Sequence, residues 1–263
     1  MKDIYKYIDE NVDEYIADLQ AFIRKPSVSA QNIGLEECAK YVKDQMHKDG
    51  LPADLHGIPG GPPLVFGHLK SSQSKKTLFC YSHYDVQPPE PIEKWSHGGP
   101  WSGALVDNVI YGRGATDNKG GLLAFNKAAK AFLKVRGEVP LNLKFFYEGE
   151  EEIGSVHLGP WVEKNKKLLE ADGMHCLDGT VDTFAKVPEV ELGLKSVLFI
   201  ELIARGGNKD IHSLNFPLVP SPPWELVHAL STIMTRDRKI LIKDWYEGLY
   251  ELGEEELNLL EEK

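Results

Sequence analysis

Four polar clusters in the sequence combine residue types that could bind a divalent cation. The first is His83-Tyr84-Asp85, in which the histidine and the aspartate are two residues apart. Residues two apart on a strand face the same side, so the Asp85 carboxylate can contact the His83 imidazole. A carboxylate in that position fixes the tautomer of a metal-binding histidine. A surface His–Asp pair at a strand end would give the same pattern.

The second cluster places Asp117 in a glycine-rich segment, residues 111–121, just before an apolar helical pattern. This segment matches neither the dinucleotide-binding motif nor the phosphate-binding loop motif. Its glycines let the chain turn sharply and present Asp117. An N-terminal helix cap is the alternative interpretation of this aspartate.

The third cluster, Glu148-Gly149-Glu150-Glu151-Glu152, follows the apolar run at residues 141–147. Carboxylates packed at a strand end repel one another, and a bound cation relieves that repulsion. One carboxylate of such a group can bind metal while its neighbour accepts a proton from an activated water. A solvated acidic turn is the simpler alternative.

The fourth cluster is Asp178, which follows the short apolar run at residues 174–177 and precedes a glycine. Alone it would be an ordinary Asp-Gly turn. Together, the four clusters each end a strand of one α/β pattern. Nitrogen and oxygen ligands of this mixture suit zinc, with manganese or cobalt as substitutes.

The motifs His-Tyr-Asp-Val-Gln-Pro, Tyr-Gly-Arg-Gly-Ala-Thr-Asp-Asn-Lys-Gly and Glu-Gly-Glu-Glu-Glu-Ile-Gly-Ser occur in this order. They resemble the catalytic core of the zinc-peptidase family that includes carnosinase, cytosolic non-specific dipeptidase, aminoacylase and acetylornithine deacetylase. The dipeptidase and carboxypeptidase-like branch is the most similar. The resemblance extends from the first helical pattern to about residue 234.

The resemblance implies a site with two divalent metal ions, zinc by preference. His83 and Asp178 would bind one ion, Asp117 would bridge both, and Glu152 would bind the second. The resemblance also implies a cis peptide bond between Asp117 and Asn118.

The same resemblance implies the remaining roles. Glu151 would be the general base and Asp85 would orient His83. His212 would reach across a dimer to polarise the carbonyl of the substrate, although a polar loop histidine is the alternative. The implied reaction is hydrolysis of the amide bond of a dipeptide or short peptide.

One implied ligand is missing from this sequence. The family's second metal needs a histidine near the C-terminus of a considerably longer chain, and no matching segment is present here. We therefore expect a C-terminally truncated form, with one metal site that has all three protein ligands and one deficient site. Full activity is not expected from this chain alone.

Two alternative functions stay open at this point. The chain could be a deacylase of N-acyl amino acids, or a non-catalytic remnant that holds a metal ion or an amino acid. Loops that would determine specificity lie partly outside the sequence. The residues present do not decide between these alternatives.

The elements that must position these residues alternate between strands and helices, which predicts an α/β domain with a mostly parallel core sheet. In such sheets, ligands bind at the carboxyl ends of the strands, where the four clusters lie. The expected strands span residues 53–58, 63–69, 77–83, 109–111, 141–147 and 174–177. The expected helices span residues 4–23, 35–47, 119–135 and 158–169.

After about residue 193 the pattern changes to a longer strand, expected over residues 195–205, and a helix over residues 224–234. We assign residues 1–193 to the N-terminal part of a three-layer catalytic domain like that of the zinc peptidases. Residues 194–263 are assigned to an incomplete α+β lid domain, through which the resemblance implies a homodimer in the full-length form.

Composition restricts the remaining possibilities. The net charge of -10 disfavours binding to nucleic acid. Apolar runs are too short to span a bilayer, and the N-terminus lacks a signal core, so a cytoplasmic protein is expected. The three cysteines follow no paired motif, which favours a reducing compartment. Cys80 and Cys176 lie in apolar runs and are expected to be buried and unreactive.

Overall fold

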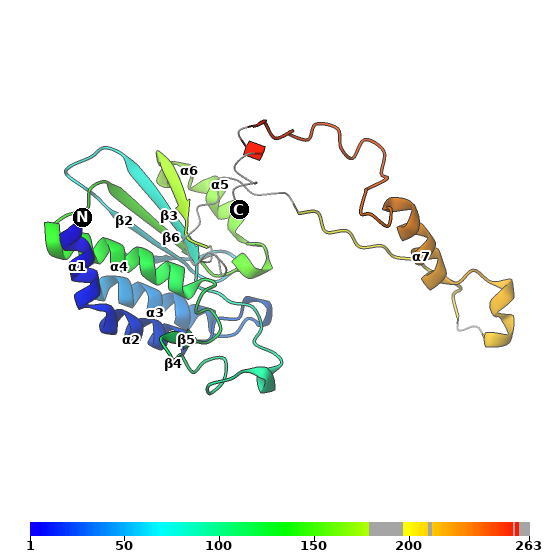
Figure 1. Cartoon of the computed structure of the whole chain (residues 1–263), viewed down its shortest axis with the longest axis horizontal. Coiled ribbons are helices and arrows are strands. Elements are labelled where there is room, and N and C mark those ends of the chain that lie inside the picture. The colour runs from blue at the N-terminus through cyan, green and yellow to red at the C-terminus, as the bar shows by residue number, and fades with distance from the viewer. Residues whose placement is uncertain (179–196, 210–211, 255, 258–263) are drawn as a thin grey trace. The chain divides into compact units, whose positions relative to one another are not determined.

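The chain divides into two compact units, Met1–Leu192 and Gly193–Lys263 (Figure 1). The computed structural model describes residues 1–178, 197–209, 212–254 and 256–257. The first unit carries all four polar clusters identified in the sequence, from His83 to Asp178. The assignment of the second unit as part of a lid domain stays a prediction.

Two of the expected helices are each divided by an asparagine. The pattern over residues 4–23 forms α1 (Lys2–Glu10) and α2 (Val12–Ile23), and the pattern over residues 158–169 forms α5 (Leu158–Lys164) and α6 (Lys166–Leu169). In both cases the side-chain amide of the asparagine donates a hydrogen bond at 2.7 Å to the carbonyl four residues before it, from Asn11 to Tyr7 and from Asn165 to Trp161. Such local hydrogen bonds compete with the backbone hydrogen bonds of the helix, and they end α1 and α5 at these positions.

The other two helices of the first unit form close to where the periodicity predicts them. They are α3 (Leu35–Lys48) and α4 (Lys119–Arg136). Gly50 and Gly137, with φ of 80° at both, follow their ends and suit the left-handed turn that terminates many helices.

The core sheet contains five strands in the order β1-β2-β6-β3-β7. The pairs β3–β6 and β3–β7 are parallel, whereas β1–β2 and β2–β6 are antiparallel. Only β2 therefore opposes the direction of the other four, which confirms the mostly parallel sheet. The strands are β1 (Asp54–His56), β2 (Leu64–Leu69), β3 (Thr77–His83), β6 (Asn142–Glu148) and β7 (Gly173–Cys176).

A separate hairpin joins β4 (Ala104–Val106) to β5 (Val109–Tyr111). Its two turn residues, Asp107 and Asn108, have φ of 49° and 63°. Positive φ at both positions is typical of the tight turn that matches the twist of a two-stranded ribbon. β4 was not among the strands expected from the sequence, although the Asp107-Asn108 pair indicates a hairpin turn at this position.

Helices cover both faces of the core sheet, which gives three layers (Figure 1). Alternate residues of β6 enter the two cores: Phe145 and Tyr147 pack with residues of α2, α3 and α4, whereas Phe146 packs with Trp161 of α5. This alternation follows from the two-residue period of a strand. Burial of these aromatic residues on both faces holds the ends of β3 and β6 in place beside each other.

The outermost strand corrects one expectation about the cysteines. Cys38 and Cys80 are buried, but Cys176 on β7 is exposed. All residues of β7 are exposed because this strand pairs with β3 on one side only, within the described residues. An apolar run identified β7 as a strand but did not show that it lies at the edge of the sheet.

A buried ionic network connects α2, α3 and α4. Lys127 of α4 lies 2.6 Å from the Asp18 carboxylate and 2.8 Å from that of Asp49. Lys130, one turn later, contacts Asp49 at 3.0 Å and Glu14 at 2.7 Å. Buried charges are tolerated when they are paired in this way. The network therefore fixes α4, whose N-terminus follows Asp117.

The carboxylates of this network make the stability of the chain sensitive to acid. Burial alone would raise the pKa of Asp18, but the ammonium groups of Lys127 and Lys48 hold it below 3.8, its ordinary value. A lowered pKa means that Asp18 contributes stability above about pH 3.8 and loses that contribution as the pH falls through its lower folded pKa. Urea unfolding between pH 7 and pH 3 should show this decline. Asp18→Asn should be less stable at pH 7 and depend less steeply on pH; an equally steep dependence would contradict the assignment.

The second unit contains the expected helix, α7 (Pro222–Ile233), which begins with prolines at its first positions. The strand expected over residues 195–205 is wrong for the part that the structure describes, because residues 197–205 form no strand. A strand requires a pairing partner, and no described segment pairs with these residues.

Among the described residues, no helix is both long and apolar enough to cross a membrane. Over the described ranges the structure also contains short 3₁₀ helices: η1 (Ser29–Gln31), η2 (Ile92–Lys94), η3 (Glu151–Ile153) and η4 (Ser213–Leu218).

Candidate metal centre

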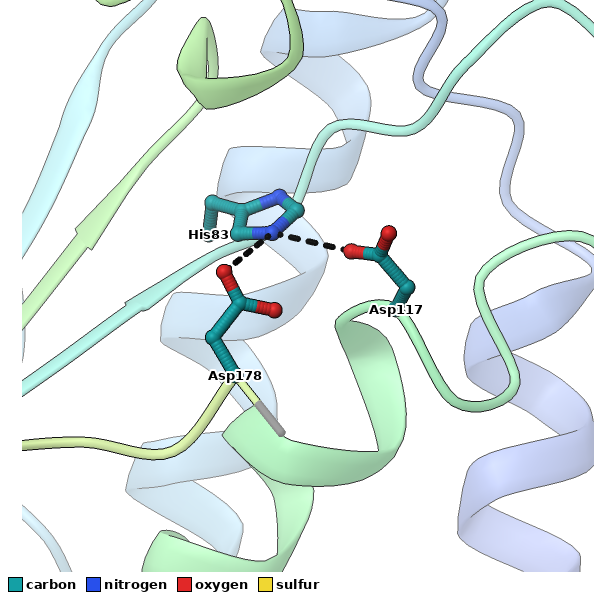
Figure 2. Close-up of side chains that lie close together, drawn as sticks. All are labelled: His83, Asp117 and Asp178. Carbon is teal, nitrogen blue, oxygen red and sulfur yellow. Dashed lines mark ion pairs between the residues drawn. The ribbon is translucent and has the colours of Figure 1, made fainter. Parts of the chain in front are cut away.

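The imidazole of His83 is the centre of a carboxylate cluster at the end of β3 (Figure 2). Its Nε2 atom lies 3.2 Å from Oδ1 of Asp117 and 3.5 Å from Oδ2 of Asp178. Oε2 of Glu151 is slightly farther away, at 3.9 Å. The His83 side chain is fully buried, whereas the three carboxylates are partly open to solvent. The structure thus brings one residue from each of the other three clusters, Asp117, Glu151 and Asp178, next to His83 of the first cluster.

Asp85 supports His83 from the opposite side of the ring. Its Oδ1 lies 3.3 Å from Nδ1 of His83, and both side chains are fully buried. The same carboxylate accepts hydrogen bonds at 3.2 Å from the backbone N–H groups of Glu151 and Glu152. The predicted contact between His83 and Asp85 is therefore present. Asp85 also connects the histidine to the turn that carries the two glutamates.

Asp117 reaches the cluster from the loop that enters α4. The peptide bond between Asp117 and Asn118 is cis, as the resemblance implied. Gly121, in the first turn of α4, lies directly against the backbone carbonyl of Leu177 and the side-chain oxygen of Asn118. This close approach brings the start of α4 next to the end of the segment that carries Asp178.

A methyl group at Gly121 should separate these two parts of the site. Gly121→Ala would place Cβ in contact with the Leu177 carbonyl, so the backbone must move. We expect a loss of about 1–3 kcal/mol in the free energy of unfolding, together with weaker Zn²⁺ binding. Urea unfolding and Zn²⁺ titration would measure both. Gly159→Ala is the matched control, because that helical glycine has open space at Cβ; equal behaviour of the two variants would contradict the prediction.

Glu152 lies on the same turn as Glu151, but its carboxylate has another partner. It accepts hydrogen bonds from the backbone N–H of Gln87 at 3.1 Å and from the side-chain amide of Gln87 at 2.9 Å. The role of Glu152 as a metal ligand stays a prediction. No role was predicted for Gln87 from the sequence, although this residue belongs to the motif that begins at His83.

The cluster requires positive charge. Burial alone would lower the pKa of His83, but the carboxylates of Asp117, Asp178 and Asp85 raise it to about 12. The close contact with the His83 imidazolium in turn lowers the pKa of Asp117. Burial raises the pKa of Glu151, and the nearby charges of Asp178 and Glu152 raise it further. Either the imidazolium or a divalent cation can balance these carboxylates.

The donor set fits a divalent metal ion. One ligand atom each from His83, Asp117 and Asp178 lie within 4.8 Å of one another. Nε2 of His83 is buried and makes no hydrogen bond of acceptable geometry, although it faces carboxylate oxygens. Such an atom is the expected metal-binding position of an imidazole whose other nitrogen contacts a carboxylate.

A second acidic group in the described residues does not share this character. Glu14, Asp18 and Asp49 also bring three carboxylates together. Their charges are balanced by Lys127 and Lys130, so this group already has its cations. Among the residues that the structure describes, only the cluster around His83 combines grouped carboxylates with a buried nitrogen that lacks a hydrogen bond.

The other histidine with an expected role is His212, in the second unit. Its side chain is exposed, and its Nδ1 accepts a hydrogen bond at 3.1 Å from the backbone N–H of Leu214. This contact is local to the loop. The expectation that His212 contacts a substrate stays a prediction.

The fold and the site define a class of protein. A three-layer α/β unit carries a His–Asp pair with Glu151 and Asp178 at the carboxyl ends of parallel strands. Asp117 instead reaches the site from the start of α4, because the strand before it, β5, belongs to the separate hairpin and not to the core sheet as expected. Residues 79–244 match the model of Peptidase family M20/M25/M40, which is more than half of the chain. The chain belongs to this family.

Individual relatives agree with this placement. The chain is 32% identical to a Cys-Gly metallodipeptidase of Schizosaccharomyces pombe, over 95% of this chain and 55% of the relative. It is 29% identical to a Beta-Ala-His dipeptidase of Homo sapiens, over 98% of this chain and 54% of the relative. The crystal structure of an M20 family metallo-carboxypeptidase from Sulfolobus solfataricus has a TM-score of 0.82 and 37% identity, over 95% of this chain and 56% of that one. The chain thus spans about half the length of these relatives.

Proposed function

We propose that this chain carries the greater part of the active site of a metal-dependent hydrolase that cleaves the amide bond of dipeptides or short peptides. The observation that carries the proposal is the unbonded Nε2 of His83, which faces the carboxylates of Asp117 and Asp178. The names of the relatives, a metallodipeptidase, a dipeptidase and a metallo-carboxypeptidase, support the reaction and the substrate class.

Two divalent metal ions, preferably zinc, are the proposed cofactors. His83 and Asp178 would hold the first ion, Asp117 would bridge, and Glu152 would hold the second. When bound, the ions would polarise the scissile carbonyl and lower the pKa of a water molecule. The hydrogen bonds between Glu152 and Gln87 make the second position the weaker one.

Glu151, Asp85 and His212 would have separate roles in the proposed hydrolysis. Glu151, partly exposed and 3.9 Å from His83 Nε2, would accept a proton from the attacking water. It would then return that proton to the leaving amine. Asp85 would keep the His83 ring in orientation through Nδ1. His212 would polarise the substrate carbonyl from the lid of a partner subunit.

A second candidate is a binding protein that retains the first metal position and has lost catalysis. The engagement of Glu152 by Gln87 favours it, because the second position then lacks a free carboxylate. Deacylation of N-acyl amino acids is a further alternative within the enzyme class.

We also propose a homodimer through residues 194–263 in the full-length form. The three free cysteines support a cytoplasmic location.

The proposed function is tested with Zn²⁺-loaded chain and two substrate panels, dipeptides and N-acetyl amino acids. We expect dipeptides to be hydrolysed faster than N-acetyl amino acids. Glu151→Gln should abolish that hydrolysis, while zinc still binds with an affinity lowered by the loss of a nearby negative charge. Hydrolysis that survives this substitution would refute the role of Glu151. Zinc binding without hydrolysis of either panel would favour the binding protein.

A further inference from the structure

Glu148, the last residue of β6, connects the strand that carries His83 to the turn that carries Glu151. Its Oε1 accepts a hydrogen bond from the Tyr81 hydroxyl at 2.6 Å and another from the Ser155 hydroxyl at 2.7 Å. Tyr81 lies on β3, two residues before His83, and Ser155 closes the turn after η3. One carboxylate oxygen therefore joins both parts of the candidate site.

The position of Glu148 is fixed by its surroundings. The residue is only 4% exposed, and its backbone carbonyl accepts the N–H of Tyr84 at 2.8 Å. The following residue, Gly149, lies so close to the ring of Tyr84 that no Cβ would fit. A carboxylate buried this deeply needs hydrogen-bond donors, because its desolvation is costly. The hydroxyl groups of Tyr81 and Ser155 supply them.

The turn at residues 150–155 is consequently held at both ends. At its start, the Asp85 carboxylate accepts the N–H groups of Glu151 and Glu152. At its end, the Ser155 backbone N–H donates to the Glu150 carbonyl at 2.8 Å, while its hydroxyl donates to Glu148. The sequence pattern predicted a role for Asp85 and none for Glu148 or Ser155, although these two residues begin and end the acidic motif.

We propose that Glu148 is a positioning residue, which holds Glu151 beside His83 by accepting the hydroxyl groups of Tyr81 and Ser155. The inference rests on the proposed function, because it explains how Glu151 is kept close to the metal position. It predicts that loss of the acceptor oxygen of Glu148 acts through Glu151 alone.

The test is a double-mutant cycle on the full chain, with Co²⁺ affinity as the measurement. Glu148→Leu should weaken Co²⁺ binding about tenfold, because it lets the Glu151 carboxylate move away from the metal position, and substitutions in the surroundings of a metal typically have effects of 10- to 100-fold. In a Glu151→Gln background the same change should alter the affinity by less than about twofold, since coupled residues are not additive. Glu148→Gln keeps an acceptor oxygen and should stay within roughly threefold of the unmodified chain.

Two milder variants provide the control. Tyr81→Phe removes a hydroxyl that binds Glu148, whereas Tyr147→Phe removes a buried hydroxyl that donates to Asn126 at 2.9 Å. Only Tyr81→Phe should weaken Co²⁺ binding. If Glu148→Leu does not fold, Tyr81→Phe takes its place in the cycle. It should weaken Co²⁺ binding in the chain with Glu151 and have little effect in the Glu151→Gln background.

Two results would overturn the inference. One is an equal loss of affinity in both Glu151 backgrounds, which would indicate a general effect on stability. The other is a loss in Glu148→Gln as large as that in Glu148→Leu, which would indicate an effect of charge. A chain that binds no Co²⁺ at all would instead overturn the proposed function, and the inference with it.

Discussion

Replacing Asp117 with asparagine should lower the affinity of the chain for Zn²⁺ at least a hundredfold, which corresponds to about 2.8 kcal/mol. The substitution keeps the shape of the side chain and removes its charge. Asp117 lies 3.2 Å from Nε2 of His83 and is the proposed bridge between the two metal positions. Substitutions behind metal ligands already cost 10- to 100-fold, so the loss of a ligand charge should cost more. Competition with a chromophoric chelator measures the affinity.

Asp107→Asn is the control for this prediction. Asp107 is an exposed carboxylate in the turn between β4 and β5 of the same unit. Its removal changes the net charge equally and should leave the Zn²⁺ affinity within about twofold, because exposed charges at a distance are screened by salt. A similar loss in both variants would mean that Zn²⁺ responds to net charge. The assignment of Asp117 would then fail.

Replacing Lys127 with methionine should lower the free energy of unfolding by about 3–5 kcal/mol. The methionine fills much of the same volume but leaves the carboxylates of Asp18 and Asp49 without their nearest cation. An uncompensated buried charge is far more costly than the ion pair that it replaces. Urea unfolding at pH 7, analysed by linear extrapolation, measures the effect.

Lys6→Met provides the comparison for Lys127→Met. Lys6 forms an exposed ion pair with Glu10 at 3.6 Å within α1. Exposed pairs of this kind are typically worth less than about 1 kcal/mol, so stability should change little. If the two lysine variants lost equal stability, the buried network would not be the connection between α2, α3 and α4 that its geometry indicates.

The central residues of the site were predictable because their positions follow from a general property of α/β sheets. His83 and Asp178 follow neighbouring parallel strands, and the carboxyl ends of such strands meet at one edge. Asp117 could be expected there because a sharp glycine-rich turn precedes its helix. The contact between His83 and Asp85 follows from the two-residue period of a strand. Each inference depends on local pattern and on one rule of topology.

Other parts of the site depend on contacts between distant segments and could not be read from one sequence. The carboxylate of Glu152 is bound by Gln87, which lies 65 residues away in the chain. The bonds of Glu148 to Tyr81 and Ser155 likewise follow from the register of β3 against β6. Spacing brings residues of this kind close together, but it does not determine which atoms meet.

The errors in the fold have similar causes. Asn11 ends α1 through a hydrogen bond from its side-chain amide to the carbonyl of Tyr7, and the apolar period continues across this break. Cys176 lies on an apolar strand that forms the edge of the sheet, and residues 197–205 lack a strand although their composition favours one. Composition predicts a strand, whereas burial and pairing depend on which segments lie beside it.

The claim on which this account depends is that His83, Asp117 and Asp178 surround one metal ion. Crystals of the chain soaked in Zn²⁺ would test it most directly, through an anomalous difference map recorded at the zinc absorption edge. The account predicts a strong peak between Nε2 of His83 and the two aspartate carboxylates, which His83→Ala abolishes. A map without that peak, or with zinc bound only at other carboxylates, would contradict it.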